Sequence, residues 1–227
     1  MLDSGLISFT FDDFFESAAS SGAGILENYG KRGTFYISSS LLGNTLPGFS
    51  ENIASAYTIE TLHSRGHEIG FHTKNHVDLS KSSRLTIMKE MIQGNTIKKI
   101  TGIKSTNFSY PYGRSYSRLD TFAKLLGYTT TRGVKTGLNN RSDRFSLCSI
   151  PIYGHSLDEK SIADLICKTV SDNMWLIFYT HDVINSHSRF GCNELQFNSV
   201  VKQAMSSKAR ILTIQEVVNL SKLPSNQ

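Results

Sequence analysis

Short apolar runs alternate with amphipathic segments along nearly the whole chain. The apolar runs are rich in β-branched and aromatic residues and stop at glycine or polar residues, as buried strands do. We expect strands at residues 6–11, 34–37, 67–71, 107–110, 128–132, 147–153, 175–179 and 210–212. Residues 137–145 show little periodicity and are expected to form a loop.

Apolar positions three and four residues apart predict helices between these strands. The expected helices are 15–29, 58–65, 83–100, 116–126, 158–170 and 194–205, followed by a last helix capped by Thr213. In the longest, Leu85, Met88 and Ile92 share one face, which is expected to be the buried one. Alternating strands and helices imply parallel strands joined by crossover helices. About seven or eight strands in one domain of 227 residues favour a barrel over an open sheet, so we expect a single α/β domain over 1–227.

The composition is that of an ordinary globular domain, with 39% hydrophobic and 19% charged residues. The chain has no long apolar run, so no membrane span is expected. It also lacks a basic segment followed by an apolar one, so no signal peptide is expected and a cytoplasmic location is predicted. The net charge is +5, but the basic residues are scattered, which favours a solvated surface over nucleic-acid binding.

The three cysteines, Cys148, Cys167 and Cys192, are widely spaced and odd in number. They indicate neither a disulfide framework nor a CxxC metal site. Cys167 falls in the apolar stripe of a predicted helix, so we expect it to be a small core residue.

Two adjacent carboxylates, Asp12 and Asp13, directly follow the first predicted strand. Buried charges are costly unless they bind a metal or a partner, and neighbours in extended chain point in different directions. One aspartate can then face a metal while the other faces a reacting water. The alternative interpretation is a strand end followed by an aspartate helix cap. In a barrel, catalytic groups gather at the carboxyl ends of the strands, where these residues fall.

Histidines follow two other predicted strands. His72 and His76 lie four residues apart, so one turn of helix would direct both imidazoles to one metal. Together with one aspartate they would form a two-histidine, one-carboxylate set with open positions for water and substrate. His181 follows the most apolar strand and is suited to donate a proton near neutral pH. The alternatives are histidines that cap the barrel or lie on its surface.

The segment Tyr110-Pro111-Tyr112-Gly113 predicts a sharp turn after the fourth strand. Such turns expose backbone N–H groups, which can stabilise an oxyanion. A plain strand-ending turn is the alternative.

In order and spacing, these motifs resemble those of the polysaccharide deacetylases with a NodB-homology domain, a carbohydrate esterase family. The resemblance extends from about residue 6 to about residue 220. The segments that carry it are Thr10-Phe11-Asp12-Asp13, His72-Thr73-Lys74-Asn75-His76, residues 29–36 and residues 66–70.

The resemblance implies a distorted (β/α) barrel of about seven strands and a metal-dependent deacetylase. Asp13, His72 and His76 would hold one divalent metal, most often zinc. Asp12 would be the general base, His181 the general acid, and the Tyr112 backbone N–H an oxyanion donor. The substrate would be an N-acetylated glycan or sugar precursor, and the products acetate and a free amino sugar. Metal preference and oligomeric state do not follow from the sequence.

The chain departs from the family pattern at several positions. Ser109 stands where many members have an arginine that orients the base, and we hypothesise that Arg132, at another predicted strand end, supplies this charge. The Asp-x-x-Asp-Trp motif is not visible, and Tyr179 replaces a leucine of the acyl pocket. These departures leave open a hydrolase of small cyclic amides or ureides. They also leave open a catalytically silent glycan-binding relative, against which the intact Asp and His set argues.

Overall fold

The computed structural model of the protein describes residues 4–46, 49, 51–92, 95–115 and 117–220. Its strands are β1 (Leu6–Phe11), β2 (Thr34–Ile37), β3 (Glu68–Phe71), β4 (Asn107–Ser109), β5 (Thr130–Arg132), β6 (Ile150–Pro151), β7 (Trp175–Thr180) and β8 (Arg210–Ile211). The strands join in one sheet in the order β5-β4-β3-β2-β1-β7-β6, and every ladder pair is parallel. Their carboxyl ends therefore meet along one rim.

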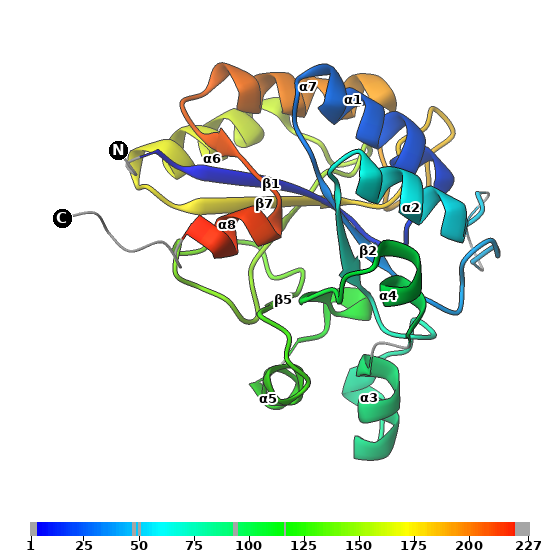
Figure 1. Cartoon of the computed structure of the whole chain (residues 1–227). Helices are drawn as coiled ribbons and strands as arrows, with labels where there is room; N and C mark the ends of the chain where they lie inside the picture. The colour runs from blue at the N-terminus through cyan, green and yellow to red at the C-terminus, as the bar shows by residue number, and fades with distance from the viewer. Residues whose placement is uncertain (1–3, 47–48, 50, 93–94, 116, 221–227) are drawn as a thin grey trace.

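The centre of the sheet is β1, which β7 accompanies along its whole length, from Leu6↔Trp175 to Phe11↔Thr180. On its other side, β8 pairs with the start of β1 and β2 with its end. Figure 1 shows β1 and β7 side by side, with α8 near the start of β1. All six residues of each strand are buried, as their mostly apolar sequences predict.

The sheet curls because an irregular segment connects its two edges. The Leu147 N–H donates to the Thr131 carbonyl, and the Gly133 N–H donates back to the Leu147 carbonyl. Three residues later the same segment pairs with β7 through Ile150 and Pro151. The expected strand 147–153 is therefore divided between two neighbours. The result is the distorted (β/α) barrel that the sequence predicts.

Helices cover the outside of the sheet. They are α1 (Ala23–Asn28), α2 (Ala56–Ser64), α3 (Arg84–Met91), α4 (Asn95–Thr101), α5 (Ser117–Leu125), α6 (Glu159–Ser171), α7 (Glu194–Ser206) and α8 (Ile214–Leu220). In Figure 1, α1, α6 and α7 lie together on one side of β1 and β7. The expected helix 15–29 is helical over residues 16–28, but Ala18–Gly22 form a π-helical turn that leads into α1. Of the helices in the described ranges, none is long and apolar enough to cross a membrane.

The prediction of one long helix over 83–100 is wrong. The structure has two helices there, α3 and α4, and residues 93–94 between them lie outside the described part of the chain, as does Tyr116. The expected buried face is also wrong, because Leu85 is 63% exposed and Met88 and Ile92 are exposed as well. The face of α3 that packs inward carries Ile87, Glu90 and Met91.

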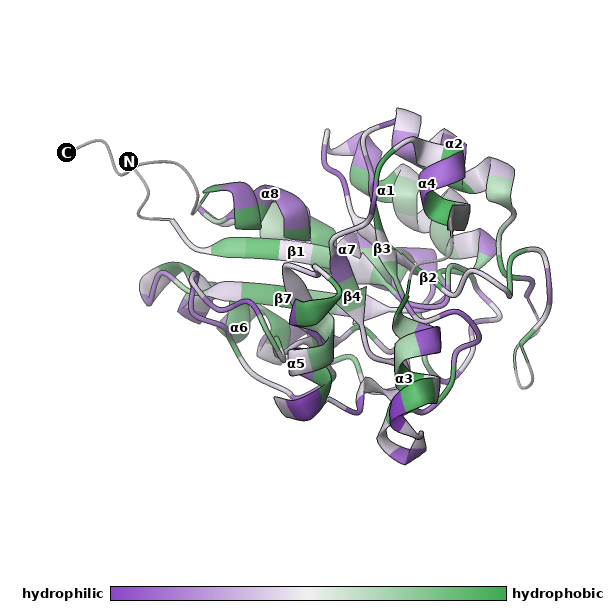
Figure 2. Ribbon diagram, turned by 60° about the horizontal axis from the view of Figure 1, so that its bottom comes forward, coloured by the Kyte–Doolittle hydropathy of each residue, from purple (hydrophilic) through white to green (hydrophobic). Residues whose placement is uncertain are grey.

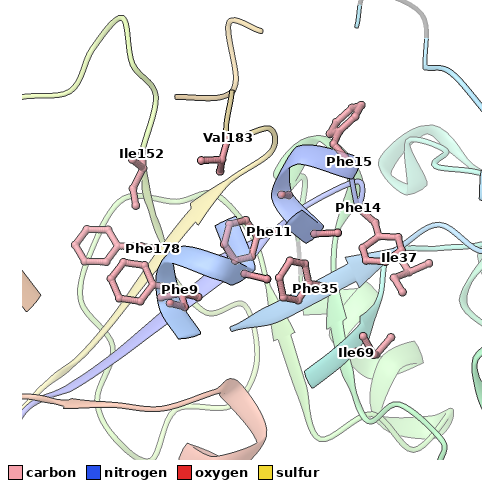
Figure 3. Packing of buried hydrophobic residues seen from close by; sticks show 14 of the residues in the cluster. Phe9, Phe11, Phe14, Phe15, Phe35, Ile37, Ile69, Ile152, Phe178 and Val183 are labelled. Carbon is pink, nitrogen blue, oxygen red and sulfur yellow. The ribbon is translucent and has the colours of Figure 1, made fainter. Parts of the chain in front are cut away.

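Phenylalanine rings form the centre of the core (Figure 3). Phe11 stacks on Phe35 with 4.5 Å between ring centroids, and Phe9 on Phe178 with 5.4 Å. Each buried ring contributes about 2–3 kcal/mol of transfer free energy. In Figure 2, β1 and β7 are mostly hydrophobic, while the helices alternate between hydrophobic and hydrophilic residues. Cys167 was expected in this core, but it is exposed on α6.

Candidate active site

The residues predicted to do chemistry meet at the carboxyl rim of the sheet. Asp12 and Asp13 follow β1, His72 and His76 follow β3, Tyr112 follows β4, and His181 follows β7. They line one cavity of about 400 Å³. The strand-end positions therefore place together side chains that lie up to 169 residues apart in the sequence.

Three of these side chains converge on one point. One ligand atom from each of Asp13, His72 and His76 lies within 4.8 Å of the other two. His76 Nε2 is 3.0 Å from Asp13 Oδ1, and His72 Nε2 is 3.5 Å from the same oxygen. The backbone between the histidines is not helical, contrary to the expectation, since Thr73 and His76 have φ values of 67° and 53°. A loop, rather than a helical turn, brings the two imidazoles together.

The protonation state of His72 indicates which kind of ligand fits between the Asp13 and His72 side chains. Its Nδ1 lies 2.7 Å from the Ser109 carbonyl, which can only accept, so Nδ1 carries the proton. Burial lowers the pKa of His72 to about 4, so the ring is neutral at neutral pH. Its Nε2 lone pair then faces Asp13 Oδ1, a buried acceptor that has no hydrogen-bond partner among the described residues. Two acceptors that face each other in a buried site fit a cation between them.

The charges around Asp13 also favour its ionised form. Burial by itself raises the pKa of Asp13, but the imidazole of His76, followed by those of His181 and His72, holds it well below the usual value. An ionised carboxylate beside two imidazoles is a donor set suited to zinc and to other divalent metals.

Asp12 faces a different partner. It is held by Arg132 of β5, whose Nη2 donates to Asp12 Oδ1. The same Nη2 donates to Ser109 Oγ at 2.7 Å, and Ser109 Oγ in turn donates to Asp12 Oδ1 at 3.3 Å. Burial by itself raises the pKa of Asp12, but Arg132, and after it His72 and His181, bring it below its usual value.

Two tyrosines enclose the Arg132 guanidinium. The rings of Tyr36 and Tyr179 lie on it with 5.1 Å from each centroid to Cζ, and Arg132 is 1% exposed. Cation–π contacts of a desolvated arginine contribute about 2 kcal/mol. Arg132 is thus in contact with Asp12, as the hypothesis requires. The catalytic role of Arg132 stays a prediction.

His181 points its second nitrogen into the site. Nδ1 lies 3.1 Å from the Phe190 carbonyl and so carries a proton, and Nε2 is 3.8 Å from Asp13 Oδ2. Phe190 belongs to a loop that Asp182 holds by accepting from Ser188 N and Oγ, each at 2.6 Å. This orientation leaves Nε2 directed at whatever occupies the cavity.

The cavity wall contains residues that the sequence did not indicate. Phe49, Val134, Tyr153 and Phe190 line it beside the predicted residues. Tyr112, with φ of 59°, stands at the cavity and is 60% exposed. The wall residues come from loops of irregular length, and the sequence pattern carries no signal for which of them turn inward.

A curled parallel sheet with paired aspartates after its first strand and histidines after two others defines a class of carbohydrate esterases. The chain belongs to the polysaccharide deacetylase family, whose sequence pattern matches residues 2–131. The resemblance to NodB-homology carbohydrate esterases is thereby confirmed. This family hydrolyses the amide or ester bonds of acetylated glycans.

Solved structures share the fold. The Xyl-CE4 domain of a multidomain xylanase from the hindgut metagenome of Trinervitermes trinervoides is 18% identical, with 99% of this chain and 94% of that chain covered and a TM-score of 0.63. A family 4 acetyl xylan esterase from Clostridium thermocellum, in complex with a cobalt ion, is 20% identical, with 96% and 93% covered and a TM-score of 0.63. The Bc1960 peptidoglycan N-acetylglucosamine deacetylase is 17% identical, with 94% and 90% covered and a TM-score of 0.61. No curated protein matches the sequence.

Proposed function

We propose that the protein is a metal-dependent N-deacetylase that removes acetyl groups from amino sugars of a polysaccharide or glycan precursor. Residues 1–227 form its deacetylase domain. The observation that carries the proposal is the convergence of His72 Nε2 and His76 Nε2 on the buried Asp13 Oδ1, which accepts no hydrogen bond from the described residues. Beside it, Arg132 holds Asp12 ionised.

Asp13, His72 and His76 would hold the metal, which we propose to be zinc. When bound there, a divalent ion polarises the acetyl carbonyl and lowers the pKa of the attacking water. Zinc suits the set because it takes imidazole nitrogen and carboxylate oxygen and leaves a position open at a catalytic site.

Asp12 is the general base in this proposal. Arg132 and Ser109 occupy Oδ1, which leaves the other carboxylate oxygen to accept a proton from the attacking water. Because the guanidinium keeps Asp12 ionised, the carboxylate is ready for this role at neutral pH.

Two further groups stabilise the oxyanion and protonate the leaving nitrogen in this proposal. The Tyr112 backbone N–H stabilises the oxyanion of the tetrahedral intermediate. As an imidazolium, His181 carries a second proton on Nε2 and gives it to the sugar nitrogen as the C–N bond breaks, while Nδ1 keeps its own, so the products are acetate and a free amine. The Phe190 carbonyl holds the ring in place for this transfer.

The similar structures include both an acetyl xylan esterase and a peptidoglycan N-acetylglucosamine deacetylase, and the leaving group distinguishes the two reactions. An amine leaves only after protonation, whereas an alkoxide leaves an ester more readily. An imidazole aimed into the cavity is therefore a larger advantage for an amide than for an ester.

The test is acetate release by zinc-loaded protein from chitooligosaccharides, peptidoglycan fragments and acetylated xylan, measured side by side. We expect release from at least one N-acetylated glycan at a higher kcat/KM than from xylan. Release from xylan alone would replace the N-deacetylase with an esterase. If the zinc-loaded protein binds the glycans but frees no acetate from any of them, it is a silent glycan-binding relative.

A further inference from the structure

Glu90 of α3 is a buried acid outside the cavity, with 6% of its surface exposed. Both of its carboxylate oxygens accept hydrogen bonds from one residue, Asn75. The Asn75 backbone N–H donates to Oε2 at 2.8 Å and the Asn75 side-chain amide donates to Oε1 at 2.6 Å. The Glu90 carbonyl accepts the Lys74 N–H at 3.0 Å. One residue of α3 thus binds two consecutive amides of the loop between His72 and His76.

This loop needs support from outside. Thr73 and His76 both adopt left-handed backbone conformations although neither is glycine, at a cost of about 1 kcal/mol or more each. The buried Thr73 Oγ1 has no hydrogen-bond partner in the described part of the chain. Besides Glu90, the Ser40 N–H holds the loop by donating to the Lys74 carbonyl at 2.9 Å.

We propose that Glu90 is a positioning residue for the metal site and acts on His76 through Asn75. The proposal rests on the proposed function only in that Asp13, His72 and His76 hold a metal. Asn75 directly precedes His76, so the two hydrogen bonds from Asn75 to Glu90 fix the direction in which the chain enters His76. A carboxylate accepts both bonds in parallel, which no neutral side chain does without turning the Asn75 amide. Without Glu90, His76 loses its fixed place opposite Asp13 Oδ1.

The test is the affinity of the metal-free protein for zinc, measured by calorimetric titration with zinc chloride. We expect Glu90→Ala to raise the Kd by about 10-fold to 100-fold, as removal of residues that support metal ligands does. Glu90→Gln should be milder, because the Asn75 amide can turn its oxygen to the new NH₂ group and restore the second bond. Asn75→Ala, which removes one bond from an exposed residue, should also lie between wild type and Glu90→Ala.

Glu68→Gln is the matched control. Glu68 is another acid of the sheet region that accepts several hydrogen bonds, but it lies at the opposite end of β3 from His72. Its Kd for zinc should stay within about twofold of wild type, because it touches no part of the ligand loop. A change in overall stability alone does not move the Kd of a variant that circular dichroism shows to be fully folded.

A folded Glu90→Ala protein with the wild-type Kd would overturn the proposal. If Glu90→Ala does not fold, a folded Asn75→Ala with the wild-type Kd would overturn it equally. These results are separate from the proposed reaction. Wild-type protein that binds zinc but frees no acetate contradicts the deacetylase and leaves the Kd comparison valid, whereas wild type without zinc binding contradicts the metal site and this role of Glu90 with it.

Discussion

Two carboxylates at opposite ends of the sheet, the buried Asp12 and the half-buried Glu68, have pKa values that are shifted in opposite directions. At the carboxyl rim, the guanidinium of Arg132 brings the pKa of Asp12 below its usual value despite burial. At the other end, burial raises the pKa of Glu68 to about 7. Glu68 accepts hydrogen bonds from the Thr34 hydroxyl at 2.8 Å and the Gln215 N–H at 2.9 Å, but no ion pair of Glu68 is found in the described residues. The cation makes the difference, because hydrogen bonds alone do not offset the loss of water.

The two ends also differ in how completely their polar atoms are satisfied. Around Glu68, the Asn107 side chain donates to the carboxylate and accepts from the Thr130 hydroxyl at 2.6 Å. At the rim, the buried Asp13 Oδ1 accepts no hydrogen bond from the described residues, and its neighbours are His76 Nε2 at 3.0 Å and His72 Nε2 at 3.5 Å. Leaving a buried acceptor unpaired costs about 1–3 kcal/mol. The hydrogen bonds around Glu68 therefore stabilise that end of the sheet. At the rim, the unmet hydrogen-bonding capacity of Asp13 lowers the stability of the fold, and a bound cation would remove this cost.

The largest expected effect comes from the metal ligands. His72→Ala should lower kcat/KM for acetate release by about 10³-fold, because it removes a ligand of the ion that polarises the carbonyl. Zinc content by elemental analysis should fall in parallel. His63→Ala, on α2 and outside the cavity lining, is the control and should keep both. Full zinc content in His72→Ala would show that the metal binds elsewhere. The rim would then differ from the Glu68 end of the sheet in its hydrogen bonds but not in binding a metal.

His181→Ala should lower kcat by about 10²-fold to 10⁴-fold without loss of zinc, because a general acid is removed and no proposed ligand is touched. An activated ester such as p-nitrophenyl acetate needs little protonation of its leaving group, so its hydrolysis should fall much less. Equal losses on the amide and on the activated ester would assign His181 to positioning or binding instead of proton transfer.

The strands that carry the rim could be predicted because they are short, mostly apolar runs. The expected ranges for β1 and β2 agree with the structure, and the rule that parallel strands end at one rim places His72 and His181 correctly. The failures come from contacts between distant residues. In the segment of α3, two apolar stripes were available, and packing buries the one with Ile87 and Met91.

The loop between His72 and His76 shows a second limit. A spacing of four residues suits a helical turn, but the left-handed Thr73 and His76 reach the same convergence in a loop. The bonds that hold this loop come from Glu90, 14 residues beyond His76, and nothing in the local sequence indicates them. The contact of Arg132 with Asp12 was predicted because Ser109 stands where the family has an arginine and because Arg132 falls at a strand end. The local sequence does not indicate it, since 120 residues separate the two.

Arg132→Ala tests whether the guanidinium keeps Asp12 ionised at the carboxyl rim. Removing the guanidinium leaves Asp12 as an unpaired buried charge, which should lower the free energy of unfolding by about 3–5 kcal/mol. Without the cation the pKa of Asp12 rises, so the acidic limb of the profile of kcat/KM against pH should move to higher pH. A misplaced base should also cost about 10²-fold in activity. Arg132→Lys keeps the charge and should shift the limb less. Full activity with an unchanged acidic limb would exclude the role we assign to Arg132.

The smallest effect is expected at the other end of the sheet, and it concerns stability alone. The pKa of Glu68 rises from 4.5 in an unfolded chain to about 7 in the folded protein. A raised pKa means that the folded state binds the proton more tightly, so its stabilising contribution is complete below pH 4.5 and is lost as the pH rises through 7. At about 1.4 kcal/mol for each pKa unit, the wild type should lose up to about 3 kcal/mol between these values.

Glu68→Gln isolates this contribution, because glutamine has the same shape and no charge to bury. The difference in unfolding free energy between wild type and Glu68→Gln, measured by urea denaturation from pH 4.5 to 8, should move in favour of the variant as the pH rises. Acetate release at pH 7 should be unchanged, since Glu68 does not line the cavity. A difference that stays constant with pH would mean that Glu68 is ionised throughout, so its hydrogen bonds would offset burial as fully as Arg132 does for Asp12.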